Sequence, residues 1–444
     1  MSGIARLLLK CGVPVSGSDL KPGRATRELE SLGARIFIGH RPENVTDADV
    51  VVYSSAVKDD NPEIIRAKAQ GLTLIKRAEA LARLMQDKSV ITVAGSHGKT
   101  TTTSLAAFLL LEAGLSPTVA IGGILKNIDA NACLGKGEFF VAEADESDGS
   151  FLCYRPKYSI ITNIDREHLD YYKDFATELE AFRNFADNTV PGGCVIYCRD
   201  DPNLRKVMDG YKSKCVSFGL SKLAGVRADK IEFAGLASDF DCIHQGRHIG
   251  RFHLALGGEH NVSNALSVIA LGLEMGIDLG FIKNTLAHYK GAGRRLEVKF
   301  KDDRLTVIDD YAHHPTEIRA TLAAASKLKY GRLIAVFQPH RYTRTKLLLD
   351  EFALSFDAAD RVIITDIYAA GEAPIDGVDA GGILEKIKMR FPSKPACYLP
   401  KEDIINHLKD ILNPGDLVMT LGAGDIVKLS DELAQEFTEK THQL

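Results

Sequence analysis

A glycine-rich loop between a predicted strand and a predicted helix constrains this chain more than any other feature. Residues 89–94 have the apolar pattern of a buried strand, and residues 105–111 continue as an apolar helix. Between them stands Gly95-Ser96-His97-Gly98-Lys99-Thr100. Glycines let backbone N–H groups approach phosphate oxygens, a helix N-terminus adds positive potential, and a lysine neutralises charge. The segment therefore predicts a nucleotide-phosphate loop within an α/β sheet.

The spacing of this loop departs from the general GxxxxGK[ST] pattern, because Val93 stands where the first glycine belongs. What remains is GxxGKT, for which a glycine-rich turn with a surface lysine is the alternative interpretation. The flanking strand and helix favour phosphate binding over that alternative. The hydroxyl of Thr100 is then suited to a magnesium ion that bridges two phosphates.

Strand-like and helix-like segments alternate along nearly the whole chain, which predicts an α/β fold with parallel sheets. The length of 444 residues suggests three domains, with boundaries near residues 88 and 292. Residues 215–256 differ, because short alternating runs surround turn signals and predict a small antiparallel insertion. The strand patterns are residues 50–53 (a buried strand), 89–94, 139–142, 159–162, 194–197, 304–309, 332–337, 361–365 and 416–420. The helical patterns are residues 24–32, 61–70, 77–86 and 260–275.

Composition excludes several classes of partner. The chain has 55 basic and 59 acidic residues, a net charge of −4. That balance gives no broad basic surface for nucleic acid or an anionic membrane. No apolar run approaches the ~18–20 residues of a membrane-spanning helix, and the first residues lack a signal-peptide pattern. Eight cysteines without a CxxC pair indicate reduced thiols, so we expect a cytoplasmic protein with no nucleic-acid and no membrane partner.

Acidic residues and a histidine follow two further strand patterns of the middle block. Residues 143–150 contain four acidic side chains, and Glu143 can complete a magnesium shell with Thr100. A solvated acidic turn is the alternative. His168 follows the strand pattern at residues 159–162, although a lone histidine is more often structural. These loops meet the phosphate loop only if their strands are neighbours in one sheet.

Two pairs of polar residues flank the start of the last block. Asn261 and Asn264 are three residues apart and share a helix face. Their amides can recognise an adenine edge or cap the helix, and both interpretations stay open. Arg294 and Arg295 lie at the second boundary, where an arginine can reach a phosphate or form an ordinary surface salt bridge.

Polar residues also end two strands of the last block. An aspartate at position 309 or 310 can bind ribose hydroxyls, and Tyr311 can pack against a base. Arg341 and Arg344 follow the next strand and can both address one anion if a helix begins there. A plain basic helix start is the alternative, but cations at a helix N-terminus oppose its dipole.

Taken in order, these motifs resemble the Mur ligases of bacterial cell-wall synthesis. The resemblance covers nearly the whole chain and implies three domains. These are a Rossmann-like UDP-sugar domain (residues 1–88), a central P-loop ATPase-type α/β domain with the antiparallel insertion (residues 89–292), and a C-terminal Rossmann-like amino-acid and nucleotide domain (residues 293–444). The matching motifs are residues 95–100, 143–150, 163–168, 260–264, 309–315 and 338–345.

The resemblance implies an ATP-dependent amide ligase of peptidoglycan precursor synthesis. ATP would phosphorylate the muramoyl carboxylate of UDP-N-acetylmuramate, and the amine of L-alanine would attack the acyl phosphate, releasing ADP and phosphate. Residues 339–344 favour L-alanine over the murein tripeptide used by a related ligase of the family. The other interpretations are a phosphotransferase that acts on a hydroxyl and an inactive nucleotide-binding homologue. We expect a monomer or a weak homodimer.

The resemblance also implies roles for single residues. The catalytic residues would be Lys99, His168 and Arg295. Thr100 and Glu143 would hold one magnesium ion, and Glu143 and His168 a second. The ATP-binding residues would be Gly95, Ser96, His97, Gly98, Lys99, Thr100, Thr101, Asn261, Asn264, Asp310 and Tyr311. The carboxylate of alanine or of the product would be held by His313, Arg341 and Arg344, and no residue is a clear general base.

The N-terminus departs from the family pattern. The family's first domain opens with a strand and a glycine-rich loop that runs GxGGxGMSGIA, whereas this chain begins with MSGIA. Because that loop would hold the diphosphate, we expect a truncated gene model with a late start codon, weak UDP-sugar binding and poor folding of the first domain. The remaining UDP-sugar contacts would be Asp19, His40, Ser54 and Ser55.

Overall fold

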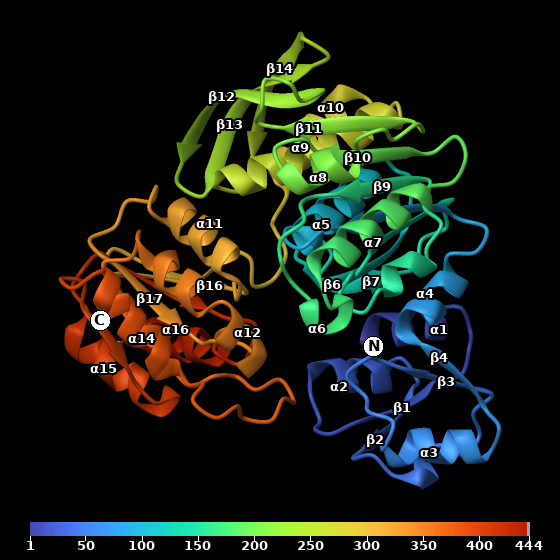
Figure 1. Cartoon of the computed structure of the whole chain (residues 1–444), viewed down its shortest axis with the longest axis horizontal. Helices are drawn as coiled ribbons and strands as arrows, with labels where there is room; N and C mark the ends of the chain where they lie inside the picture. The colour runs from blue at the N-terminus through green and yellow to red at the C-terminus, as the bar shows by residue number, and fades with distance from the viewer. Residues whose placement is uncertain (442–444) are drawn as a thin grey trace. The chain divides into compact units, whose positions relative to one another are not determined.

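The computed structural model describes residues 1–441 and divides the chain into two compact units. The first unit contains Met1–Asp229, Asp241–Phe252 and Ser263–Lys290. The second contains Lys230–Phe240, His253–Val262 and the chain from Gly291 onward. The first unit starts in blue and the second ends in red in Figure 1. No helix within the described range has both the length and the apolar composition needed to cross a membrane.

The N-terminal part forms two separate pairs of parallel strands. β1 (Ser16–Asp19) pairs with β2 (Arg35–Ile38), and β3 (Val50–Tyr53) pairs with β4 (Thr73–Lys76). The prediction that β3 is buried is wrong, because Val50 is 40% exposed and the rest of the strand is half-buried. A strand in a two-stranded sheet keeps one open edge, which its apolar sequence does not reveal. The helices here are α1 (Ser2–Lys10), α2 (Arg24–Ser31), α3 (Pro62–Ala69) and α4 (Arg77–Leu84).

The largest sheet has ten strands in the order β14-β13-β12-β11-β10-β9-β5-β8-β6-β7. Its strands are β5 (Ser89–Ala94), β6 (Thr118–Leu125), β7 (Ala130–Cys133), β8 (Phe139–Glu143), β9 (Tyr158–Ile161), β10 (Cys194–Cys198), β11 (Cys215–Gly219), β12 (Val226–Ala234), β13 (Ala237–His244) and β14 (Arg247–Leu254). The accompanying helices are α5 (Lys99–Glu112), α6 (Leu169–Tyr172), α7 (Phe175–Asp187), α8 (Pro202–Val207), α9 (Glu259–Glu274) and α10 (Leu279–His288).

The centre of this sheet brings the predicted loops together. β5 lies between β8 and β9 and is parallel to both, so the three strands end at the same edge. Each strand is short and nearly continuous in apolar residues, as expected for a parallel strand covered on both faces. α5 begins with a polar turn of threonines, continues as an apolar helix, and is buried from Thr101 to Leu110, so the helix that follows the phosphate loop is held firmly in place.

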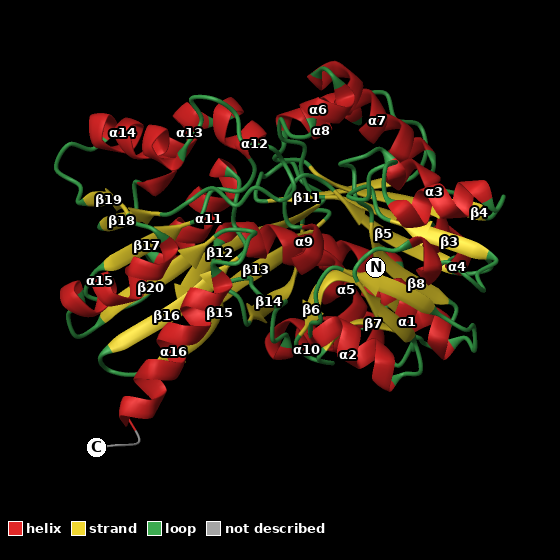
Figure 2. Ribbon diagram, turned by 90° about the horizontal axis from the view of Figure 1, so that it is seen from below, coloured by secondary structure: helices red, strands yellow, loops and turns green. Residues whose placement is uncertain are grey.

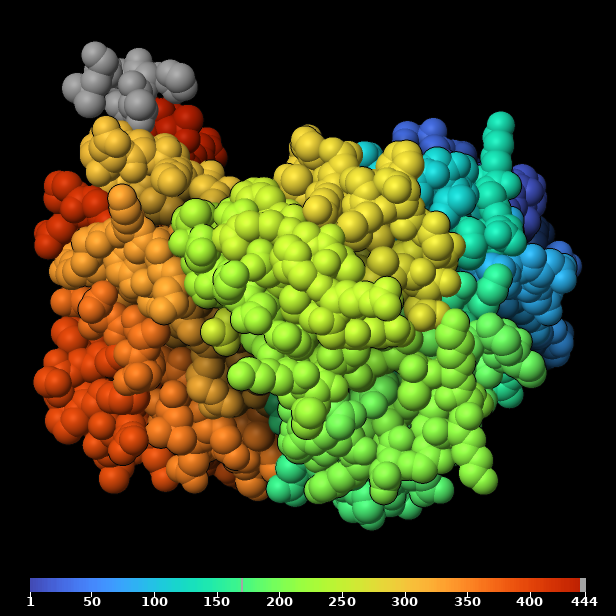
Figure 3. All heavy atoms as spheres, turned by 90° about the horizontal axis from the view of Figure 1, so that it is seen from above, coloured from blue at the N-terminus to red at the C-terminus, as the bar shows by residue number. Residues whose placement is uncertain are grey.

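The predicted antiparallel insertion needs a correction at its first strand. β11 pairs parallel with β10, with Val195 opposite Cys215, and parallel with β12, with Phe218 opposite Val226. β11 to β14 therefore belong to the ten-stranded sheet and form one end of it. A period of two in hydrophobicity shows that one face is exposed but does not reveal the direction of the neighbouring strand. The yellow-green atoms of Figure 3 show these later strands on the molecular surface.

The second unit contains a six-stranded sheet in the order β15-β16-β20-β17-β18-β19. Only β15 is antiparallel to its neighbour. The strands are β15 (Glu297–Lys301), β16 (Leu305–Asp310), β17 (Leu333–Phe337), β18 (Arg361–Ile364), β19 (Ala396–Tyr398) and β20 (Asp416–Leu421). The helices are α11 (Pro315–Ala325), α12 (Tyr342–Leu347), α13 (Leu349–Ala353), α14 (Ala380–Arg390), α15 (Ile404–Ile411) and α16 (Val427–Thr441).

Helices cover both faces of this second sheet. Phe337 of β17 packs in one core with Phe352 of α13 and Ile383 of α14. Val336, the next residue toward the other face, packs in a second core with Leu433 of α16. Figure 2 shows α13 and α14 on one side of the strands and α16 on the other. This arrangement confirms the predicted Rossmann-like C-terminal architecture.

Candidate active site

The phosphate loop occupies the turn between β5 and α5, and its two glycines are required by close contacts. Gly98 has φ 84°, and a Cβ there would lie 2.6 Å from the amide oxygen of Asn264. Gly95 has φ 125°, and a Cβ there would collide with the hydroxyl of Thr162. Both glycine positions therefore follow from backbone shape and crowding, as the sequence pattern predicts.

The loop is tied to the segment after β9. The backbone N–H groups of Ser96 and His97 donate to the backbone oxygen and side-chain oxygen of Asn163, at 3.1 and 2.8 Å. The N–H of Asp165 donates to the hydroxyl of Ser96 at 2.8 Å. These bonds occupy the amides of two predicted ATP-binding residues. The N–H groups that remain suited to phosphate are those of the first turn of α5, which has no intrahelical acceptors for them.

Lys99 lies folded over its own loop. Its ammonium donates to the carbonyl oxygens of Gly95 and Ser96, at 2.6 and 3.2 Å, and to Glu146 at 2.7 Å. Burial opposes the charged form, but the neighbouring carboxylates of Glu146 and Asp145 outweigh it and raise the pKa of Lys99. The lysine is therefore charged at neutral pH, with its ammonium bonded to the loop and to Glu146.

Thr100 and Glu143 face each other at the start of α5 and the end of β8. The Thr100 hydroxyl is hydrogen-bonded to the Glu143 carboxylate, which also accepts the N–H of Gly122 at 2.9 Å. Burial raises the pKa of Glu143. A hydroxyl beside a carboxylate is the hard-oxygen donor set that magnesium prefers, so these two residues fit that ion.

His168 lies against two acids other than the predicted partner. Its Nε2 is 3.6 Å from Glu146 and 3.7 Å from Glu167. The three side chains present ligand atoms within 4.8 Å of one another. His168 also has φ 58°, a backbone conformation that non-glycine residues rarely adopt. The sequence analysis gave no role to Glu146 or Glu167, although Glu146 stands in the acidic run and Glu167 precedes His168.

The two asparagines of α9 are both buried. Asn261 is 6% exposed, and its amide donates to the carbonyl oxygen of Gly257 at 2.8 Å. Asn264 is 7% exposed and lies against Gly98 of the phosphate loop. Both residues lie inside α9, which begins at Glu259, so neither is the residue that caps its N-terminus. Their predicted contact with adenine stays a prediction.

The adjacent arginines of the second unit have different surroundings. Arg294 donates to the buried carboxylate of Asp309 at 2.9 Å and to the carbonyl oxygens of Gly422 and Gly424 at 2.6 and 3.1 Å. Both guanidinium groups lie over the ring of Tyr311, at 5.1 and 5.2 Å from its centroid, and Arg295 forms a longer ion pair with Glu317 at 3.7 Å. Arg294 is therefore fixed by the fold, and Arg295 is the better candidate for a ligand contact.

Asp310 also holds backbone. Its two carboxylate oxygens accept the N–H groups of Leu296 and Ala312 at 2.7 and 2.8 Å, and it is 3% exposed. Burial raises the pKa of Asp310 to about 6. A predicted ribose contact would have to use the lone pairs that these two bonds leave.

Several rings pack together near the residues that are predicted to bind the substrate carboxylate, His313, Arg341 and Arg344. His313 lies edge-on to His340, and the ring of His340 stacks on Tyr368 with centroids 5.7 Å apart. A guanidinium nitrogen of Arg344 lies 3.3 Å from Nδ1 of His340. Burial lowers the pKa of His340 to about 3, with the neighbouring His313 and arginines adding to the effect. His340 and Tyr368 belong to this group although the sequence analysis assigned them no role.

The predicted UDP-sugar residues are only partly brought together. His40 lies 3.0 Å from the hydroxyl of Ser18, which donates to Glu63 at 2.7 Å. Asp19 is exposed at the end of β1, and Ser54 and Ser55 follow β3, in the other strand pair. Sequence reasoning missed Ser18 and Glu63 because neither stands in a recognisable motif.

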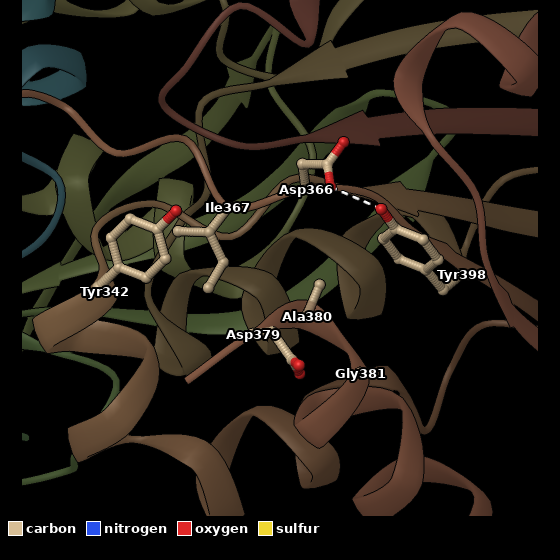
Figure 4. A pocket seen from close by; sticks show the side chains of 7 residues that line it. All are labelled: Tyr342, Asp366, Ile367, Asp379, Ala380, Gly381 and Tyr398. Atoms are coloured by element: carbon tan, nitrogen blue, oxygen red, sulfur yellow. Dashed lines mark hydrogen bonds between the residues drawn. The ribbon is translucent and has the colours of Figure 1, made fainter. Parts of the chain in front are cut away.

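A separate cavity of about 410 Å³ opens beside the carboxyl ends of β18 and β19 (Figure 4). It is lined by Tyr342, Asp366, Ile367, Asp379, Ala380, Gly381 and Tyr398. The hydroxyl of Tyr398 donates to Asp366 at 2.6 Å across its wall. None of these residues is among the predicted site residues.

Three family models match consecutive parts of the chain. The Mur ligase family catalytic domain matches residues 1–89, the Mur ligase middle domain residues 93–272, and the Mur ligase glutamate ligase domain residues 294–424.

Relatives with assigned activities are similar over nearly the full length. A UDP-N-acetylmuramate–L-alanine ligase from Pelotomaculum thermopropionicum is 45% identical over 441 residues, which cover 99% of this chain and 95% of the relative. One from Anaeromyxobacter dehalogenans is 46% identical over 98% of this chain and 94% of the relative.

Two solved structures are similar as well. A UDP-N-acetylmuramate-alanine ligase from Thermotoga maritima has a TM-score of 0.84 and 30% identity, covering 99% of this chain and 97% of its own. A murein peptide ligase from Psychrobacter arcticus has a TM-score of 0.72 and 26% identity, covering 98% and 96%.

Proposed function

The chain belongs to the Mur ligase family, and from that premise we propose that it joins L-alanine to UDP-N-acetylmuramate with consumption of ATP. The observation that carries this function is 45% identity over 441 residues to a ligase of that activity. The family matches and the similar ligases confirm the predicted ligase activity and the three-domain α/β fold. The domain boundaries near residues 88 and 292 and the roles of single residues are proposals.

The reaction is an acyl transfer through an acyl phosphate. The muramoyl carboxylate attacks the γ-phosphorus of ATP and ADP leaves. The alanine amine then attacks the acyl carbon, a tetrahedral intermediate forms, and phosphate leaves as the amide is made. Lys99 is charged and sits at the start of α5, where it can stabilise charge on the transferring phosphoryl group. Arg295 is the proposed γ-phosphate contact of the second unit.

Magnesium would be held by Thr100 and Glu143, whose oxygens already face each other. When bound, the ion would neutralise negative charge on phosphate oxygens. The second ion near His168 stays part of the proposal.

The alanine carboxylate is proposed to bind Arg341 and Arg344, with His313 beside them. A zwitterionic amino acid needs a cationic grip at its carboxylate while its amine stays unbound for attack. Since His340 is neutral at physiological pH, the positive charge of the proposed carboxylate-binding site comes from the arginines.

The setting of the reaction completes the proposal. Because ATP and a nucleotide sugar are consumed, we place the enzyme in the cytoplasm, as a monomer or a weak homodimer. Asp19, His40, Ser54 and Ser55 are the proposed contacts of the UDP-sugar.

The test is ADP release by the full chain with ATP, magnesium and UDP-N-acetylmuramate, measured with and without L-alanine. We expect release that depends on alanine, together with the UDP-muramoyl-alanine product by mass spectrometry. Lys99→Ala should abolish turnover. Release that ignores alanine would indicate a phosphotransferase, and ATP binding without release would indicate an inactive homologue.

A further inference from the structure

Glu146 is a buried carboxylate that depends on one strong partner. Its side chain is 0% exposed, and its Oε1 accepts a hydrogen bond from the Lys99 ammonium at 2.7 Å. Within residues 1–441, its Oε2 accepts no hydrogen bond. The hydroxyl of Tyr172 donates to the backbone oxygen of Glu146 and holds the peptide in place. The carboxylate is thus fixed beside the lysine and poorly compensated without it.

Every N–H group of the Lys99 ammonium already donates a hydrogen bond. An ammonium has three N–H groups, and all three are used, by Gly95, Ser96 and Glu146. A phosphate oxygen can bind only by replacing one of these acceptors. Two of them are carbonyl oxygens of the loop itself, so the anionic phosphate would replace the anionic carboxylate.

We propose that Glu146 is a positioning residue that takes the place of phosphate on Lys99 in the nucleotide-free protein and releases the lysine when ATP binds. The exchange keeps the lysine ordered before ATP arrives. It also weakens ATP binding, because an unpaired carboxylate in a buried site is unfavourable. His168, whose Nε2 lies 3.6 Å from the same oxygen, is the nearest donor that could then approach Glu146.

The inference rests on the proposed function only in that ATP binds at this loop. The test is calorimetric titration of ADP, without magnesium, into the wild type, Glu146→Gln and the control Glu167→Gln. Glutamine keeps an oxygen for Lys99 and removes the charge. We expect Glu146→Gln to bind ADP about tenfold more tightly, the difference between a charge-assisted and a neutral hydrogen bond. Glu167→Gln removes a neighbouring charge whose electrostatic effect on Lys99 is smaller than that of Glu146, and we expect a smaller change.

A second measurement separates this role from a general effect of charge. In a Lys99→Ala background, Glu146→Gln should give no gain in ADP affinity, because the contact it relieves is already absent. Equal or weaker ADP binding by Glu146→Gln, or the same gain with and without Lys99, would overturn the proposal.

The wild type provides a test that needs no substitution at Glu146. The ¹⁵N signal of the Lys99 ammonium, assigned with Lys99→Ala, should shift when ADP is added, and an unchanged signal on saturation would contradict the exchange. Tight ADP binding without alanine-dependent turnover would refute the ligase function while leaving the role of Glu146 intact.

Discussion

Arg294 and Arg295 are neighbours in sequence, yet we expect the loss of Arg294 to reduce mainly stability and the loss of Arg295 to reduce mainly turnover. Arg294 pairs with Asp309, which is 0% exposed, and with two carbonyl oxygens. Removing one partner of a buried ion pair leaves an uncompensated charge. Arg294→Ala should therefore lower the free energy of unfolding by about 3 kcal/mol in urea titrations. Arg295→Ala loses a longer, 3.7 Å ion pair with Glu317, so it should lower the free energy of unfolding by less than Arg294→Ala does while reducing ligase turnover. The reverse pattern would refute the assignment.

Glu178 of α7 offers a second prediction for a single residue. It is 0% exposed, and neither carboxylate oxygen has a hydrogen-bond partner within the described residues. Burial, with the nearby charge of Glu146, raises the pKa of Glu178 from 4.5 to about 8. The folded protein therefore keeps a proton that the unfolded chain loses, so stability is present below pH 4.5 and is lost as pH rises toward 8.

The measurement is urea unfolding of the wild type and Glu178→Gln between pH 5 and pH 8. The wild type should lose up to about 1.4 kcal/mol per pH unit relative to the variant, which cannot ionise. Glu180→Gln, on the exposed face of the same helix, is the control and should follow the wild type. Parallel profiles for wild type and Glu178→Gln would contradict the raised pKa.

Among the elements, β6 and α5 make a contact that positions Thr100, one of the proposed magnesium ligands. A Cβ at Gly123 of β6 would lie 2.9 Å from the Cγ2 methyl of Thr100. Gly123→Ala should displace the threonine hydroxyl, and a shift of about 1 Å in a reacting group can cost about 100-fold in turnover.

The control for this prediction removes the colliding methyl group. Thr100→Ser keeps the hydroxyl and deletes Cγ2, so Thr100→Ser with Gly123→Ala should recover most of the turnover and of the magnesium dependence. Activity that stays low in the double variant would show that Gly123 acts by another route.

The elements also show what the sequence could and could not reveal. β5 and β17 are continuous apolar runs, and their predicted positions agree with the structure to within one residue. β1 (SGSD) and β7 (ANAC) were missed, because they contain few large apolar side chains. Their pairing comes from neighbours in the sheet, and that is a tertiary effect which local patterns do not encode.

The candidate site follows the same division. The glycine-rich loop and the acidic run could be predicted because each is a continuous segment that directly follows a strand pattern. The neighbourhood of β8, β5 and β9 needed the sheet order. The contact of Lys99 with Glu146 needed side-chain positions, since residues 47 apart give no local signal of pairing.

In the whole molecule, the phosphate loop and the proposed amino-acid contacts belong to different units. Lys99 and Thr100 lie in the first unit, and Arg341 and Arg344 in the second. Arg344→Ala should therefore raise the KM for L-alanine about 10- to 100-fold, as expected for loss of a charged hydrogen bond, and leave ADP affinity unchanged. Lys346→Ala, an exposed cation on the same helix, is the control. Loss of ADP binding in Arg344→Ala would contradict this separation.

We expect the choice between free alanine and a murein peptide to depend on the same two arginines. In an alanyl peptide the alanine carboxyl is part of an amide, so it has no charge for Arg341 and Arg344 to bind. L-Alaninamide tests this directly, because it keeps the attacking amine and the methyl group but lacks the carboxylate. We expect the wild type to prefer L-alanine over L-alaninamide by about 100-fold in kcat/KM, and Arg344→Ala to lose most of that preference through slower use of alanine. If the wild type used both equally, the arginines would not hold the carboxylate, and a peptide substrate would become the better interpretation.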